Sequence, residues 1–237
     1  MKKEESKQIE DYLLLYKLPL DILLEVKDHM STQIAEIQAE KEITFEKAFT
    51  ETKLAWEKDL KPAKFKLLFQ DEVPMIVKKL SKEKYWDILK KSLYISVLPL
   101  LTMLSYVYIS KDLEMFTLLF RIQIGLSVIA PIIFLIINKK TWKFFHKDFK
   151  FQGKVHYTIY QNTASFYFLY SMFAVQVFNS GGTHMYKYLK IENSANVIQF
   201  LITTIGVMST HVMIIFILFV LSKHKQTLKK IQKFIVE

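Results

Sequence analysis

The chain has 237 residues, of which 51 % are hydrophobic and 14 % aromatic, whereas glycine and proline number five each. This composition is too apolar for a disordered chain and too poor in turn residues for an all-β protein. Cysteine is absent, which excludes a disulfide framework, thiol catalysis and cysteine-ligated zinc. The net charge is +10, but residues 1–80 hold 14 lysines against 16 acidic residues, so the excess lies farther along, beside the apolar segments. That placement is typical of a membrane protein and argues against a nucleic-acid partner.

Residues 1–60 are predicted to form a small cytosolic domain of three amphipathic helices, because no apolar signal-peptide core follows the first lysines. The first helix stops before Pro19, and the second opens there, since proline is tolerated in the first turn of a helix. The third starts after Thr44, a residue type suited to the N-cap. None of these helices can bury its apolar stripe alone, so we expect them to pack together.

Residues 12–60, YLLLYKLPLDILLEVKDHMSTQIAEIQAEKEITFEKAFTETKLAWEKDL, resemble the HAAS-type domain of bacterial membrane proteins. The matching positions are Leu18, Pro19, Glu25, His29, Ala48 and Phe49. The resemblance implies a small cytosolic helical module ahead of membrane spans. Such modules are often encoded beside PadR-like repressors and are assigned to signalling, so a PadR-like regulator or a related cytosolic protein is the implied partner.

Glu25, Asp28 and His29 share one face of the second predicted helix, at spacings of three and four residues. Such a trio can ligate a metal, but it supplies three ligands and the sequence offers no second cluster to complete them. The resemblance implies a structural or partner-binding role for Glu25 and His29. We therefore interpret the trio as a partner-binding surface and expect no metal site.

Residues 61–91 are expected to connect this domain to the membrane. Pro62 and Pro74 bracket a segment rich in lysine and phenylalanine, which we interpret as a linker helix. Residues 75–91 are basic and amphipathic, and they suit a helix that lies along the anionic inner headgroups. An ordinary soluble helix is an equally good interpretation of residues 75–91.

Four membrane helices are predicted, at residues 92–110, 115–138, 157–178 and 197–222. The last is a run of 26 residues without a charge, or ~39 Å of helix against a bilayer core of ~30 Å. The segments 81–91, 138–156 and 223–237 hold 15 lysines, against three in the connections on the opposite side. The positive-inside rule then places both termini in the cytoplasm, with residues 223–237 as a basic tail. The expected fold class is all-α, a cytosolic helical domain followed by a four-helix bundle in a bacterial inner membrane.

Polar residues inside these spans are the other candidate functional residues. Arg121 in span two either extends to the outer headgroups or contacts an anion or substrate. His211 lies near the midplane of span four, either bonded to a neighbouring span or acting as a proton relay or ligand contact. Thr204 lies seven residues before it on the same helix, and Gln176 adds polarity to span three. The partners that we expect for His211 are Ser105, Ser127, Tyr167 or Tyr170.

The sequence has no nucleophile elbow, P-loop, paired-histidine zinc motif or glycine-rich dinucleotide turn, so we expect neither an enzyme nor a cofactor. The leading hypothesis is a membrane-anchored regulatory adaptor whose cytosolic helical module binds a partner. The alternative is a small transporter or channel subunit, based on His211, Arg121 and the prolines at 99 and 131, which fall at matched depths of spans one and two.

Overall fold

The computed structural model describes residues 2–64, 72–139, 158–160, 163–191 and 196–236. The described chain is helical except for one two-stranded ladder, as the sequence predicts for an all-α protein. It divides into two compact units. Unit 1 comprises Met1–Lys84, Lys140–Gln161 and His224–Glu237, and unit 2 comprises Tyr85–Lys139 and Asn162–Lys223.

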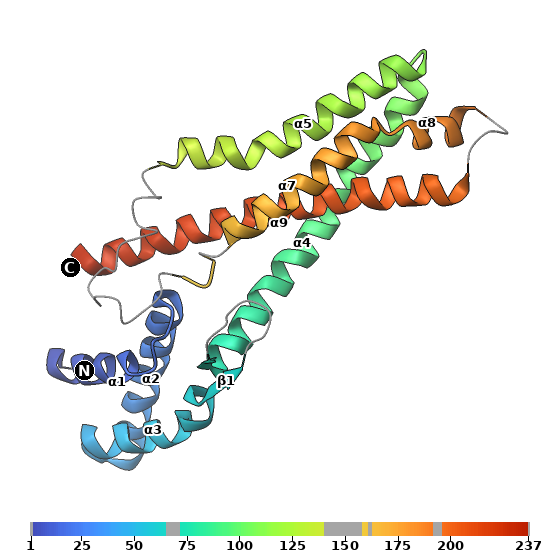
Figure 1. Ribbon diagram of the computed structural model, residues 1–237. Helices are drawn as coiled ribbons and strands as arrows, with labels where there is room; N and C mark the ends of the chain where they lie inside the picture. Colours follow the sequence, from blue (N-terminus) through green and yellow to red (C-terminus); the bar gives the residue numbers. More distant parts are fainter. Residues whose placement is uncertain (1, 65–71, 140–157, 161–162, 192–195, 237) are drawn as a thin grey trace. The chain divides into compact units, whose positions relative to one another are not determined.

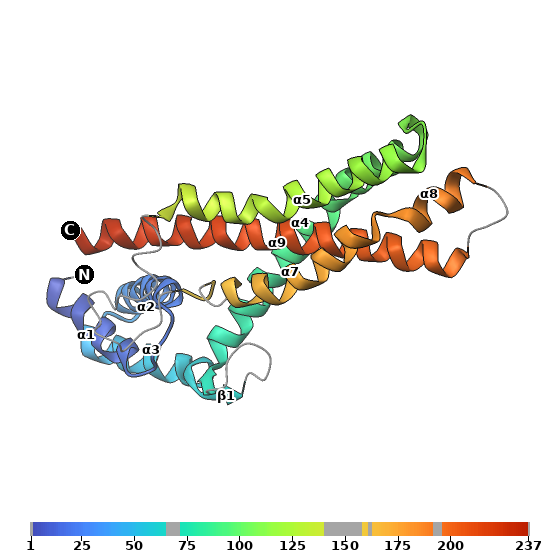
Figure 2. The same cartoon turned by 45° about the horizontal axis from the view of Figure 1, so that its top comes forward.

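The N-terminal part of unit 1 holds three helices, α1 (Lys3–Leu14), α2 (Leu20–Lys41) and α3 (Phe45–Leu60), which lie together in Figure 2. The starts of α2 and α3 agree with the prediction, with Pro19 and Thr44 at their N-caps. The helices bury apolar side chains from their facing stripes, and these include Ile9, Leu13, Leu23, Met30, Ile34, Ala48 and Phe49. The shared burial explains why the three helices form together, since each stripe alone is too narrow to stabilise a helix in water.

A β-ladder follows α3 in place of the expected linker helix. Strand β1 (Pro62–Lys64) pairs antiparallel with β2 (Glu72–Pro74), and Pro62 lies opposite Pro74. The prediction of a helix across this segment was wrong. Each proline lacks a donor N–H and biases the residue before it toward extended backbone, so both ends of the segment favour strand geometry.

Helix α4 runs from Met75 to Ile109 without a break. No helix end lies at the expected division near residue 92, where the Ser92 hydroxyl donates to the Ile88 carbonyl within α4 at 2.8 Å. The division between an interfacial helix and a first span stays a prediction.

Unit 2 continues through a tight turn into α5 (Leu113–Ile137), and the two helices separate from that turn in Figures 1 and 2. The Asp112 side chain caps α5 by accepting from the Met115 N–H at 2.8 Å. Helices α7 (Thr163–Ser180) and α8 (Thr183–Lys190) follow, and α8 lies in the connection between the predicted spans at 157–178 and 197–222. The last helix, α9 (Val197–Val236), continues through the predicted basic tail.

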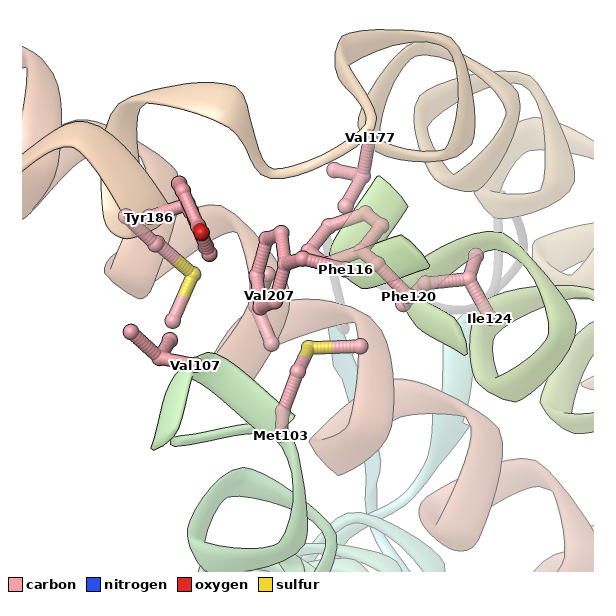
Figure 3. Close-up of a cluster of buried hydrophobic side chains, with 9 residues drawn as sticks. Met103, Val107, Phe116, Phe120, Ile124, Val177, Tyr186 and Val207 are labelled. Atoms are coloured by element: carbon pink, nitrogen blue, oxygen red, sulfur yellow. The ribbon is translucent and has the colours of Figure 1, made fainter. Parts of the chain in front are cut away.

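The core of unit 2 gathers side chains from α4, α5, α7, α8 and α9, as Figure 3 shows. Its buried members are Met103, Val107, Phe116, Phe120, Ile124, Val177, Met185, Tyr186 and Val207. The rings of Phe116 and Tyr186 have centroids 5.3 Å apart. The short helix α8 is therefore part of the packed core and not a surface appendage.

Three helices of the described chain are long and apolar enough to cross a membrane, namely α4, α5 and α9. Many large apolar side chains of α4 and α5 are exposed, among them Leu98 at 67 % and Ile137 at 74 %. Such faces suit contact with lipid, because a water-soluble surface of this kind would drive aggregation. Helix α7 is not among the three, so the four-span bundle stays a prediction. The lysine-rich segment 138–156 falls almost entirely outside the described residues.

Candidate functional site

Glu25, Asp28 and His29 lie on α2 in unit 1, on a ridge between two depressions. Glu25 is half-buried and forms an ion pair with Lys84 of α4 at 2.8 Å, whereas Asp28 and His29 are exposed. Within the described residues, no group of three histidine, aspartate or glutamate side chains is arranged to hold a metal. The trio therefore presents polar groups to a surface, with Asp28 facing one depression and His29 the other.

The larger depression is a cavity of about 800 Å³ that is lined by both charged and apolar side chains. Its wall combines α2 and α4 with Tyr160 and the C-terminal part of α9. The charged side chains that line it are Asp21, Glu25, Lys27, Asp28, Lys84 and Lys230. We call it the α2 cavity. Its volume lies in the usual range for a site that takes a small molecule or a few side chains of a partner.

Asp21 is the most perturbed group of the α2 cavity. Its Oδ1 accepts from the Ile159 N–H at 3.3 Å, while Oδ2 is buried and has no hydrogen-bond partner among the described residues. Burial raises the pKa of the Asp21 carboxyl to about 6, and the charge of Lys84 and backbone donors offset part of that effect. A carboxylate with one satisfied and one unsatisfied oxygen is a candidate acceptor for a ligand.

The wall opposite α2 is fixed by a hydrogen-bonded chain. The Tyr160 N–H donates to the Thr158 hydroxyl at 3.1 Å, and that oxygen lies 2.8 Å from His224 Nδ1 on α9. The network fits a hydroxyl that donates to an unprotonated Nδ1, because its own oxygen is already an acceptor. Residues 158–160 thus join the start of α2 to α9 within unit 1.

The second depression, of about 590 Å³, lies on the other side of the ridge. Val26, Ile76 and Leu80 contribute aliphatic side chains to its lining. The Trp56 indole N–H donates to Gln33 Oε1 at 2.8 Å, which fixes the ring at the border of α3. Glu25 lines both depressions, so one side chain borders both surfaces.

His211, in unit 2, has a partner from another helix, although not one of those that we expected. Its Nε2 lies 3.4 Å from the side-chain nitrogen of Gln123 on α5, and its Nδ1 lies 2.9 Å from the Val207 carbonyl. Gln123 also donates to the Pro99 carbonyl at 2.7 Å. These contacts fit a ring with its proton on Nδ1, since the Gln123 amide then supplies one hydrogen to each acceptor.

The other polar candidates of the predicted spans stay separate from His211. Arg121 is exposed on α5, with its guanidinium 5.9 Å from the centroid of the Phe178 ring. The Thr204 hydroxyl donates to the Phe200 carbonyl of its own helix at 2.8 Å. Gln176 is exposed on α7. The structure thus brings together His211 and Gln123, and not the set chosen from the sequence.

Asp21 and Gln123 are the two polar residues that sequence reasoning missed. Gln123 lies 15 residues before the end of the predicted second span, ~22 Å by helix rise, and His211 lies ~18 Å from the same edge. Their similar depth was a usable signal. Asp21 follows a proline at a helix start, where an acid is ordinarily an exposed residue that complements the helix dipole, so its burial left no mark in the sequence.

Comparison of the chain with protein-family models, with curated proteins and with solved structures finds no match. The class that the fold defines is a helical membrane protein with three long apolar helices among its described residues. Its two surface depressions lie in unit 1, and the interhelical polar contact between Gln123 and His211 lies in unit 2.

Proposed function

We propose that the chain is a membrane-anchored regulatory adaptor whose N-terminal helical module binds a cytosolic protein. The observation that carries the proposal is the α2 ridge, where Glu25, Asp28 and His29 lie between two depressions that each combine charged and apolar side chains. Mixed surfaces of this kind suit a protein partner, because interfaces combine buried apolar area with polar contacts. The resemblance of residues 12–60 to HAAS-type domains supports the same function.

The set of chain segments that belong to unit 1 supports four crossings of the membrane and a cytoplasmic location for both termini. Residues 1–84, 158–160 and 224–236 belong to this one unit, which can lie on only one side of a membrane. The chain leaves it in α4, returns in α5, and returns a second time in α9. An outward crossing between Tyr160 and α9 is then required, and α7, with 18 residues and ~27 Å of helix, is the element available for it.

Reporter fusions test this topology in a bacterial inner membrane. Fusions after Lys111 and after Lys187 should report a periplasmic location, whereas fusions after Lys147 and at the C-terminus should report the cytoplasm. A cytoplasmic report from the Lys187 fusion would contradict four crossings, and it would favour three.

Site-specific photocrosslinking in living cells tests the adaptor function. A photoreactive residue at His29, on the ridge, should form an adduct with one defined protein. The control is Lys47, an exposed position on α3 that borders neither depression. Equal adducts from both positions, or none from His29, would remove the support for a partner site on α2.

The structure gives the alternative, a small transporter or channel subunit, no specific support. The two ring nitrogens of His211 contact Gln123 and the Val207 carbonyl within unit 2, and helix packing accounts for both contacts. Arg121 lies beside an aromatic ring. We therefore assign these side chains to helix packing, where interhelical hydrogen bonds contribute to stability.

A further inference from the structure

The α2 cavity is lined by three acidic and three basic side chains, but two of the basic ones are already held in ion pairs. Lys27 pairs with Glu10 at 2.7 Å, and Lys84 pairs with Glu25 at 2.8 Å. Of the charged groups that line the cavity, two carboxylates and one ammonium then have no ion-pair partner in the described part of the chain. These are Asp21, Asp28 and Lys230.

Asp21 differs from Asp28 because its carboxylate has a buried oxygen, Oδ2, without a hydrogen-bond donor among the described residues. Asp28 is exposed, so water can satisfy its carboxylate, but Oδ2 of Asp21 has no donor among the described residues. The other oxygen already accepts from the Ile159 N–H, which fixes the carboxylate against the cavity wall. A buried acceptor held in one orientation next to open volume is ready for a donor that enters from outside.

We propose that the α2 cavity binds an ammonium or guanidinium group, which donates to Oδ2 of Asp21. The inference rests on the adaptor function, in which this cation is the lysine or arginine side chain of the partner protein. A free amine or guanidine is the other source of the same chemistry. The hydroxyls of Ser31 and Thr227 line the same cavity and can accept from the remaining N–H groups.

Calorimetry on the full chain in lipid nanodiscs tests the cation site directly. N-acetylarginine amide should bind at pH 7.5, and the uncharged citrulline analogue of the same shape should not. Asp21→Asn should weaken arginine-amide binding tenfold or more, because a hydrogen bond to a charged acceptor is among the stronger ones. The matched control is Glu46→Gln, a charge removal at an exposed α3 position outside both depressions, which should leave binding unchanged.

Proton release supplies a readout on the unaltered protein. The carboxyl of Asp21 has a pKa of about 6 and faces groups on each element around it, namely Lys84, Lys27, Glu25, Asp28, Tyr160, His224 and Lys230. A cation favours the ionised form, so arginine-amide binding at pH 6 should release about half a proton per site and at pH 8 almost none. Titrations in two buffers of different ionisation heat measure this number.

The outcomes separate the cation site from the adaptor function. Arginine amide that displaces the protein crosslinked at His29 identifies the partner's side chain as the source. Arginine amide that binds through Asp21 without displacing it identifies a free cation as the source. Absence of binding at millimolar probe, equal binding to Asp21→Asn, or no proton release at pH 6 overturns the cation site, whether or not the His29 adduct forms.

Discussion

Gly182 offers the sharpest test of how α8 is attached to unit 2. It is the N-cap of α8, with φ at +65°, in the left-handed region that residues with a Cβ rarely adopt. An added Cβ would lie 2.4 Å from Cδ2 of Phe120 and 3.1 Å from Cε1 of Phe116, both buried core rings. Both rings are closely packed in the core, so they cannot move aside without disrupting the contacts of neighbouring side chains.

The Gly182→Ala substitution should therefore destabilise the full chain. A residue with a Cβ in left-handed backbone lowers the free energy of unfolding by about 1–2 kcal/mol, and overpacking lowers it by about 1–3 kcal/mol. The expected loss of stability is therefore about 2–5 kcal/mol. The assay is thermal and denaturant unfolding in detergent micelles, followed by circular dichroism. The apparent Tm should fall, and Lys190, which donates to the Ser110 carbonyl, should become accessible to amine labelling.

Gly125→Ala is the matched control, because the same methyl group is added inside α5 with open space around it. The nearest atom to its Cβ is Cε2 of Phe178, at an ordinary contact distance of 3.8 Å. Alanine is the better helix former, so this substitution should be neutral or should stabilise by up to about 1 kcal/mol. Equal effects of the two substitutions would refute the argument that the Gly182 turn is packed against Phe120.

Three further outcomes follow from burial and hydrogen bonding. Ile34→Ala in the core of unit 1, where the side chain is 1 % exposed, should lower the free energy of unfolding by about 2–4 kcal/mol, as urea titration would measure. Asp21 has a pKa of about 6 in the folded chain against 3.8 for the free group. The contribution of Asp21 to the free energy of unfolding is therefore most favourable below pH 4, and it falls by about 3 kcal/mol as the pH rises through 6. Asp21→Asn should flatten that part of the stability profile. His211→Leu should weaken unit 2 by ~0.5–2 kcal/mol, and a double-mutant cycle with Gln123→Leu should give a coupling of ~0.6 kcal/mol, whereas zero coupling would mean that the 3.4 Å contact contributes nothing.

The sequence predicted the elements that have local signals. Pro19 and Thr44 stand at the N-caps of α2 and α3 with extended backbone, a local geometry that depends on a few neighbouring residues, although the Thr44 side chain makes no capping hydrogen bond. The long charge-free run at 197–222 requires a helix wherever it meets lipid, because backbone groups there have no other partners. Its residues lie within α9.

The errors occurred where contacts between distant residues decide the structure. Pro62 and Pro74 each favour extended backbone locally, but their pairing across the ladder is a contact between distant residues that no local signal predicts. The contact between His211 and Gln123 depends on how α5 and α9 are rotated about their axes, which helix rise alone does not give. Depth along the helix reduces the number of possible partners for His211, but the rotation of each helix about its axis decides which of them it contacts.

Asp21 shows why a candidate functional residue can lack a signal in the sequence and still be distinct in the structure. At neutral pH its ionised, half-satisfied carboxylate opposes folding by about 3 kcal/mol, and its pKa of about 6 is a measure of the same penalty. A cation that donates to Oδ2 would remove much of this penalty, so ligand binding and stabilisation of unit 1 are expected to be coupled.

The contacts of Asp21 extend this coupling to α9. Asp21 also accepts from the Ile159 N–H, and the neighbouring residue Thr158 contacts His224 on α9. Occupancy of the cavity should therefore tighten the link between α2 and α9, and hydrogen exchange of the Ile159 N–H should slow when N-acetylarginine amide is added. Unchanged exchange at that amide in the presence of bound arginine amide would show that the cavity and the α9 junction are independent.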